Sequence, residues 1–246
     1  MAGVSGRSTT PIIALDRSSA ADALAVVDEL GERCRFYKVG NELFTAAGPA
    51  VVRELRGRGS QVFLDLKFHD FPNTVAHGVA NAAELGARLV TVHAAGGEAM
   101  VRAAAEAARR AAEEHGVLCE VLAVTVLTSL TPFDLADAWG RSGAVDAMDE
   151  VLRLTELATR AGANGVVCSG REATQVRARF GAEIRILVPG VRPAGSSRDD
   201  QARVVTPADA AAAGANYIVV GRPVTAAPDR PQAMDAILAE LGNSPR

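Results

Sequence analysis

Short apolar runs alternate with longer amphipathic or alanine-rich stretches along the whole chain. A run of about four to eight apolar residues bounded by turn formers is typical of a buried strand, whereas a longer stretch with helical periodicity is typical of a helix. The apolar runs predict eight strands, at Pro11–Asp16, Arg35–Val39, Phe63–Phe68, Arg88–His93, within Val117–Leu127, and at Gly165–Cys168, Ile184–Val188 and Tyr217–Val220.

Helical patterns separate these strands. Ser18 is the expected N-cap of the first helix, which runs to Leu30, and Pro72 suits the first turn of the helix that follows the third strand. The other helices are expected up to about Arg56 with a break at Gly48-Pro49, from Pro72 to about Leu85, and over Glu98–Glu114, Phe133–Trp139, Asp149–Ala161, Arg171–Phe180, Pro207–Ala213 and Pro231–Leu241.

Eight strand-helix units in a chain of 246 residues predict an α/β fold, a (β/α)8 TIM barrel. The chain shows no linker and no shift of composition, so we expect a single domain over residues 1–246, with residues 1–10 flexible. A doubly wound sheet with a second domain fits this pattern less well. The 48% hydrophobic content is enough for a large core.

Composition narrows the class of partner. The formal net charge is -3 and aromatic residues make up 4% of the chain, which argues against a nucleic-acid binder and favours a small-molecule partner. No stretch reaches the length of a membrane span, and the N-terminus has no secretory apolar region. Cys34, Cys119 and Cys168 lie far apart in apolar runs, so we expect buried free thiols and a cytoplasmic location.

The stretch from Phe63 to Thr74, FLDLKFHDFPNT, carries the candidate chemistry. In a regular strand, Asp65 and Lys67 share one face, and Asp70 lies just beyond the end of the strand. Acid, base and acid are therefore expected to converge at the mouth of the barrel. A structural ion pair at a strand terminus is the alternative reading of Asp65 and Lys67.

The positions of the lysines also support a chemical role for this stretch. Of the 26 basic residues only Lys38 and Lys67 are lysine, and both are expected at strand ends. Lysine differs from arginine in being a compact charge that can give up a proton. An arginine-rich chain that keeps lysine at these two positions indicates proton chemistry there.

A second candidate feature follows strands seven and eight. These strands end in Pro189-Gly190-Val191-Arg192 and in Gly221-Arg222. In TIM barrels the loops after these strands commonly hold phosphate, and glycine lets backbone N–H groups approach an anion that a guanidinium can also bind. The two motifs together predict a phosphate site. The long loop after strand seven has the composition of a mobile functional loop.

The histidines allow ordinary interpretations. His69 and His77 are expected at an interface or on the surface, and His93 either orients the charged network or bonds within the core. No His, Cys and Asp cluster has the spacing of metal ligands, so the sequence requires no metal.

With these features, the chain resembles the orotidine 5'-phosphate decarboxylase family over nearly its whole length. Phe71 departs from the family's pattern, because the family usually has a smaller aliphatic residue at this position. The difference affects local packing alone. The motifs that carry the resemblance are ALD at Ala14, YKVG at Tyr37, FLDLKFHDFPNTV at Phe63, TVHAAGG at Thr91, VLTS at Val126, PGVRP at Pro189, DDQAR at Asp199 and VVGRPVT at Val219.

The resemblance implies decarboxylation of orotidine 5'-monophosphate without a cofactor or metal, in a homodimer. It implies that Lys67 donates a proton to C6 within a network with Asp65, Lys38 and Asp70. Asp70 and Thr74 would reach into the partner's site, and Asp16 would bind the ribose hydroxyls. The remaining substrate contacts that it implies are Thr128 and Ser129 on the pyrimidine side, and Pro189, Arg192, Gln201, Gly221 and Arg222 largely at the phosphate.

Two other functions stay open on the sequence. A sugar-phosphate relative with the same D-x-K-x-x-D strand, such as 3-keto-gulonate 6-phosphate decarboxylase, would use Mg²⁺. The KFHDFPNT, LTS and DDQAR blocks argue against it. A non-catalytic sensor of a phosphorylated ligand could share the barrel, although the complete set of Asp65, Lys67 and Asp70 argues for an enzyme.

Overall fold

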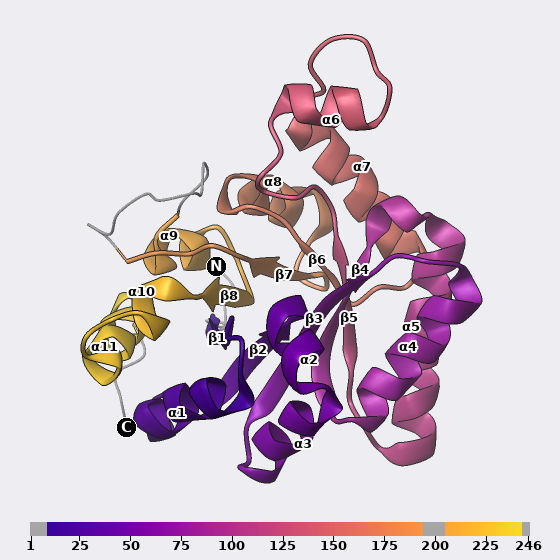
Figure 1. The fold of residues 1–246 in the computed structure, drawn as a ribbon. Coiled ribbons are helices and arrows are strands. Elements are labelled where there is room, and N and C mark those ends of the chain that lie inside the picture. Colours follow the sequence, from indigo (N-terminus) through magenta and orange to yellow (C-terminus); the bar gives the residue numbers. More distant parts are fainter. Residues whose placement is uncertain (1–8, 194–204, 243–246) are drawn as a thin grey trace, which may run out of the picture.

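Eight parallel strands close into a barrel in which each strand pairs with its neighbour in the sequence and β8 pairs with β1 (Figure 1). The structure is a computed structural model and describes residues 9–193 and 205–242. The predicted (β/α)8 barrel is confirmed. The strands are β1 Thr10–Ala14, β2 Phe36–Gly40, β3 Gln61–Phe68, β4 Ala87–His93, β5 Glu120–Val124, β6 Gly165–Val167, β7 Arg185–Val188 and β8 Tyr217–Val220.

Helices surround the barrel and connect successive strands (Figure 1). The predicted break at Gly48-Pro49 is confirmed, since Gly48 has a φ of 63° and Pro49 opens a new helix. The α-helices are α1 Ala20–Leu30, α2 Asn41–Ala47, α3 Pro49–Gly57, α4 Pro72–Glu84, α5 Glu98–His115, α6 Pro132–Ala138, α7 Ala147–Arg160, α8 Gly170–Phe180, α9 Pro207–Ala212, α10 Arg222–Thr225 and α11 Arg230–Glu240.

Three local predictions need correction. Ser19, and not Ser18, caps α1, because its side chain accepts the Asp22 N–H. Lys38 does not end its strand: β2 continues to Gly40, because it stays paired with β3 as far as Asp65. The short helix α10 directly after β8 was not expected from the sequence.

The core has two layers. Side chains that point outward from the strands pack against the helices, and those that point inward fill the barrel. The inward layer includes Ile12, Phe63, Leu89 and Leu122, all at most 1% exposed. In the described part of the chain these side chains fill the barrel below its mouth, so the space for a ligand lies at the carboxyl ends of the strands.

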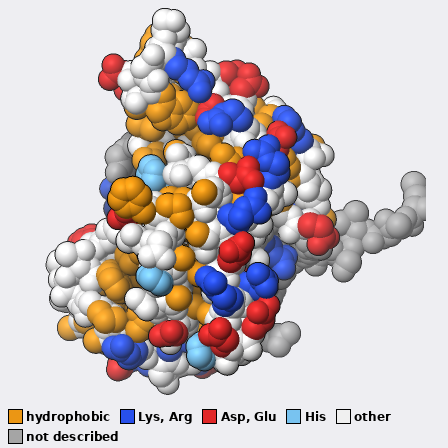
Figure 2. Space-filling model, turned by 90° about the vertical axis from the view of Figure 1, so that its right-hand side faces the viewer, with side chains coloured by type: hydrophobic (Ala, Val, Ile, Leu, Met, Phe, Trp, Pro, Cys, Tyr) orange, Lys and Arg blue, Asp and Glu red, His pale blue; other side chains and the backbone are white. Residues whose placement is uncertain are grey.

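The surface on the side of α4 and α5 carries charges of both signs. Figure 2 shows acidic and basic side chains interleaved on this face, with apolar side chains gathered beside them. Glu98 on α5, for example, bonds with Arg160 of α7 at 3.2 Å. This face therefore has no uniformly basic character of the kind that nucleic acids attract.

The described residues do not include the two ends of the chain. Thr10 begins β1, and residues 1–8 and 243–246 lie outside the described residues, so the single domain over 1–246 stays a prediction. In the part of the chain that the structure describes, no helix combines the length and the apolar character needed to cross a membrane.

Candidate active site

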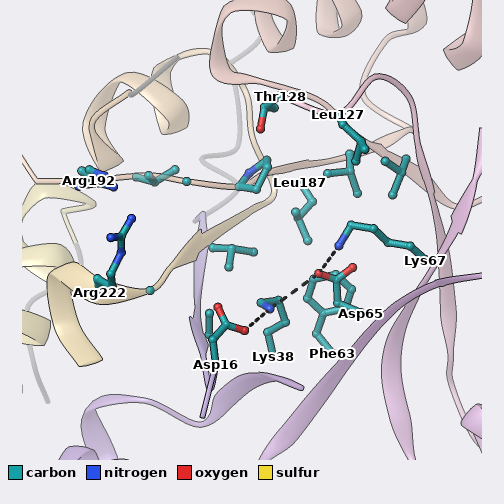
Figure 3. Close-up of a pocket in the computed structure, with 18 of the residues that line it drawn as sticks. Asp16, Lys38, Phe63, Asp65, Lys67, Leu127, Thr128, Leu187, Arg192 and Arg222 are labelled. Carbon is teal, nitrogen blue, oxygen red and sulfur yellow. Dashed lines mark hydrogen bonds and ion pairs between the residues drawn. The ribbon is translucent and has the colours of Figure 1, made fainter. Parts of the chain in front are cut away.

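A cavity of about 540 Å³ opens at the carboxyl ends of the strands. It is the location at which TIM barrels place their active sites. Figure 3 shows a charged cluster on one side of this cavity and two arginines on the other. Its polar lining is made up of Asp16, Arg17, Lys38, Asp65, Lys67, Thr128, Arg192 and Arg222.

The charged cluster centres on Asp65. Its Oδ2 lies 2.8 Å from the Lys67 Nζ and 3.8 Å from the Lys38 Nζ. Lys38 also pairs with Asp16, at 2.8 Å between Nζ and Oδ1. The Asp65 carboxylate, 11% exposed, is thus shared between two ammonium groups, while Lys67, 33% exposed, faces the cavity. The predicted pairing of Asp65 with Lys67 is confirmed.

The backbone under this pair is less regular than the sequence suggested. Leu64 pairs with Val90 and Phe68 with Val92, so four steps along β3 match two along β4. Lys67 has a φ of 51°, and it is the one non-glycine residue with positive φ within residues 9–193 and 205–242. A β-bulge therefore presents the lysine, in place of simple strand alternation.

The absence of a side chain at Gly40 leaves space for the Lys38 ammonium group. A Cβ built on Gly40 would lie 2.8 Å from the Lys38 Nζ and 3.4 Å from the Asp16 Oδ1. Gly40 has ordinary extended backbone angles, so its value lies in the missing side chain and not in conformational freedom. This contact explains why a glycine follows the YKV run.

The opposite side of the cavity carries two arginines. Arg192 is 5% exposed and lines the cavity together with Gly190, whose φ is 68°, and Pro189. Gly221 and the exposed Arg222 approach from the end of β8 (Figure 3). Guanidiniums and glycine backbone N–H groups are the kinds of group that bind phosphate in proteins, so this side agrees with the predicted phosphate site, which stays a prediction.

The family model described as "Orotidine 5'-phosphate decarboxylase / HUMPS family" matches residues 9–237. The chain belongs to this family. It is 47% identical over 233 residues to the orotidine 5'-phosphate decarboxylase of Shigella flexneri serotype 5b, covering 95% of this chain and 93% of that protein. The decarboxylase of Nitrosococcus oceani is also 47% identical, over 94% of this chain and 97% of that protein.

A solved structure shares the family's fold. The orotidine 5'-phosphate decarboxylase of Lactobacillus acidophilus superposes with a TM-score of 0.83 at 36% identity, covering 95% of this chain and 99% of that chain. The resemblance read from the sequence motifs is thereby confirmed.

Not every predicted residue of the family's site lines the cavity. Asp70 and Thr74 are exposed and do not belong to the cavity lining, so Asp70 does not join Asp65 and Lys67 within the chain. The Asp70 carboxylate instead accepts the Phe71 N–H at 2.6 Å. Ser129 is likewise exposed and outside the lining. Gln201 lies outside the described residues.

Two residues of the site were not singled out in the sequence. Arg17 lines the cavity, and its Nη2 donates to the Thr225 carbonyl at 2.6 Å. Thr91 is buried beneath Asp65, and its hydroxyl donates to the Asp65 Oδ1 at 2.8 Å. Arg17 directly follows Asp16, a predicted site residue, and Thr91 is the first residue of the TVHAAGG motif. Their places in the sequence could therefore have pointed to both residues.

His93 lies next to the charged cluster. Its ring centroid is 5.4 Å from that of His69. Burial lowers the pKa of His93, nearby His69 and Lys67 lower it further, and Asp65 opposes them. The combined effect favours the neutral form of the imidazole. His77 is exposed on α4, as expected of a surface residue.

The three cysteines are free and buried, as predicted. Burial raises the pKa of the Cys34 thiol to about 11 and that of Cys119 to about 12, so both stay protonated and unreactive. Among the described residues, no group of three or more His, Cys, Asp or Glu side chains is arranged to hold a metal ion.

Proposed function

We propose that this protein decarboxylates orotidine 5'-monophosphate to uridine 5'-monophosphate and CO2, the last step of de novo pyrimidine nucleotide synthesis. The observation that carries the proposal is a cavity with the Lys67 ammonium, paired with Asp65, on one side and Arg192 and Arg222 on the other (Figure 3). The identity of 47% to named decarboxylases supports it.

Lys67 acts as the proton donor in this proposal. When the bond between C6 and the carboxylate breaks, the electron pair stays on C6 in the plane of the ring, where no carbonyl π-system can take it up. An ammonium fixed beside C6 stabilises the developing charge and then transfers its proton to C6. Arginine holds its protons too tightly for this step. The scheme requires no cofactor.

The remaining residues bind and orient the nucleotide. Arg192, Gly221 and Arg222 hold the phosphate together with Pro189. Gln201, which lies outside the described residues, is proposed to contribute to the same contact. Asp16, paired with Lys38, binds the ribose hydroxyls, and Thr128, which lines the cavity, contacts the pyrimidine. Because the phosphate is remote from C6, its binding energy is available to organise the site.

The assay on orotidine 5'-monophosphate, followed by loss of absorbance, tests this function directly. Turnover that is unchanged by EDTA is the expected result. Turnover that EDTA abolishes, with a sugar phosphate as the preferred substrate, would favour the Mg²⁺-dependent relatives instead. Absence of turnover on either substrate, with ligand binding retained, would indicate a sensor.

We further propose a homodimer whose active sites are shared. Asp70 and Thr74 are exposed at the rim of the barrel, as residues that serve a partner's site must be. Phe71, between them in the chain, is 79% exposed, the highest fraction among the large hydrophobic side chains of the described residues, and the proposed interface would cover it. The partner's Asp70 would then join the Asp65 and Lys67 network from across the interface.

Mixing two inactive variants tests the shared site. Lys67→Ala and Asp70→Ala homodimers are each expected to be nearly inactive. If each site draws on both chains, random exchange makes about half the dimers mixed, each with one complete site, so about a quarter of wild-type activity returns. Co-purification of differently tagged chains must first show that subunits exchange. With exchange shown, activity no higher than the mean of the two parents would place Asp70 in its own chain's site.

The location of the protein is the cytoplasm in this proposal. Three buried free thiols without a disulfide among the described residues fit a reducing compartment. A fractionation experiment that found the protein with secreted or periplasmic material would contradict it.

A further inference from the structure

The bulge in β3 leaves the backbone at Lys67 without its regular ladder partner. Between the pairs Leu64–Val90 and Phe68–Val92, three residues of β3 face a single residue of β4, which is Thr91. Lys67 itself adopts a left-handed φ of 51°, a conformation that residues with a Cβ seldom take. Such a conformation persists where surrounding contacts hold it in place.

The Thr91 side chain supplies those contacts. Its hydroxyl accepts the Lys67 backbone N–H at 3.0 Å and donates to the Asp65 Oδ1 at 2.8 Å. Thr91 is 0% exposed. A hydroxyl can donate and accept at the same time, whereas a methyl group of the same shape can do neither.

This pair of bonds holds two members of the charged cluster, Asp65 and Lys67. With Oδ1 held by Thr91, the other oxygen of Asp65 points to the Lys67 Nζ at 2.8 Å and toward the Lys38 Nζ at 3.8 Å. The same hydroxyl holds the backbone from which the Lys67 side chain starts. One buried hydroxyl is therefore bonded both to the carboxylate and to the backbone of the residue that carries the ammonium.

We propose that Thr91 is a positioning residue for proton transfer, whose hydroxyl holds Asp65 and Lys67 in the arrangement that the reaction requires. This inference rests on the proposed decarboxylase function. Thr91 does not belong to the cavity lining, so it acts through Asp65 and Lys67 and does not touch the substrate.

Another buried threonine offers a matched control. Thr155 is also 0% exposed, and its hydroxyl donates to the Val151 carbonyl at 2.7 Å within α7, outside the cavity lining. Thr155→Val removes a buried hydroxyl in the same way as Thr91→Val but leaves the charged cluster unchanged. Thr91→Ser retains the hydroxyl and loses only a methyl group.

The test measures kcat and KM for orotidine 5'-monophosphate in the wild type and these three variants, together with their thermal unfolding midpoints. Thr91→Val is expected to lower kcat by about tenfold to a hundredfold, the range that small misplacements of catalytic groups cause. KM should change by less than about threefold, because the phosphate side of the cavity is untouched. Thr91→Ser should recover to within about threefold of the wild-type kcat, and Thr155→Val should match the wild type within about twofold.

Several outcomes would overturn the inference. A Thr91→Val variant with kcat within about twofold of the wild type would do so, as would a Thr91→Ser variant as slow as Thr91→Val. If Thr91→Val does not fold, Thr91→Cys replaces it under the same thresholds, because a thiol is only a weak donor and acceptor. Absence of turnover by the wild type refutes the proposed function itself, whereas wild-type turnover with an unaffected Thr91→Val refutes this inference alone.

Discussion

Each end of the barrel holds a network of charges around a carboxylate, and of these two networks only the one at the carboxyl ends lines the cavity. At the amino ends of the strands, Glu120 accepts from Arg88 at 3.0 Å and from the Tyr217 hydroxyl at 3.1 Å, with Arg185 at 3.8 Å. At the carboxyl ends, Asp65 is shared between Lys38 and Lys67. Both networks centre on a carboxylate that is about a tenth exposed or less.

The cation and the space beside it distinguish the two networks. The amino end uses arginines, which keep their protons, and packs Tyr217 edge-on against Phe36 at 6.1 Å between centroids. The carboxyl end uses the only two lysines of the chain and opens onto the cavity. A buried ion pair alone therefore says little about function, whereas the lysine at the carboxyl end is also open to a ligand in the cavity, as the proposed proton transfer requires.

The largest expected effect comes from removing the ammonium at the carboxyl end. Lys67→Ala should lower kcat at least about a thousandfold, or about 4 kcal/mol of barrier, because the carbanion loses its stabilising charge and its proton donor. The fold should persist, since the Lys67 side chain faces the cavity. Steady-state kinetics and circular dichroism would check both, and a variant within tenfold of the wild type would contradict the assignment.

A smaller effect is expected at the phosphate side of the cavity. Arg222→Ala should lower kcat/KM for the nucleotide by about a hundredfold, because it removes a charge-assisted contact to the dianion. The free nucleoside, orotidine, lacks that dianion, so its turnover should change by less than about threefold. Equal losses for both substrates would show that Arg222 does not bind the phosphate.

A subtler change at Gly40 tests the placement of Lys38. The added methyl group of Gly40→Ala would lie 2.8 Å from the Lys38 Nζ and would push the ammonium away from Asp65 and Asp16. A flexible side chain can move at little cost to the fold, so kcat should fall by about tenfold while the unfolding midpoint changes by less than about 3 °C. A variant with unchanged kcat would mean that the position of Lys38 tolerates this shift.

A substitution in the network at the amino end should lower the stability of the fold and leave kcat unchanged. Glu120→Gln removes the charge that Arg88 and Arg185 face, which we expect to cost about 2 kcal/mol and to lower the unfolding midpoint by about 4–8 °C. The kcat should stay within about twofold of the wild type, because the charged cluster lies at the other end of the barrel. A loss of activity without a loss of stability would contradict the view that the network at the amino end is structural.

Local signals made most of the barrel predictable from the sequence. Apolar runs bounded by turn formers located all eight strands, and Gly48-Pro49 and Pro72 marked helix boundaries through their own backbone restrictions. The adjacent serines Ser18 and Ser19 were harder to separate, because either can cap a helix and tertiary context decides which one does.

Contacts between distant residues explain what the sequence could not predict. The left-handed φ of Lys67 depends on a hydrogen bond to Thr91, 24 residues further along the chain. The Glu120 network joins strands that only the closed barrel brings together. Asp70 was expected beside Lys67, but the turn after β3 leaves it exposed, since strand periodicity no longer applies beyond the strand's end.

A reciprocal exchange of cations tests the central claim most directly, namely that the carboxyl end needs a lysine for its proton. The measurement is kcat on orotidine 5'-monophosphate for Lys67→Arg and for Arg88→Lys, each beside the wild type. We predict that Lys67→Arg keeps less than about a hundredth of the wild-type rate although its charge is unchanged, and that Arg88→Lys stays within about twofold. A Lys67→Arg variant that keeps more than about a tenth of the rate, a loss of less than about 1.4 kcal/mol, would contradict the account.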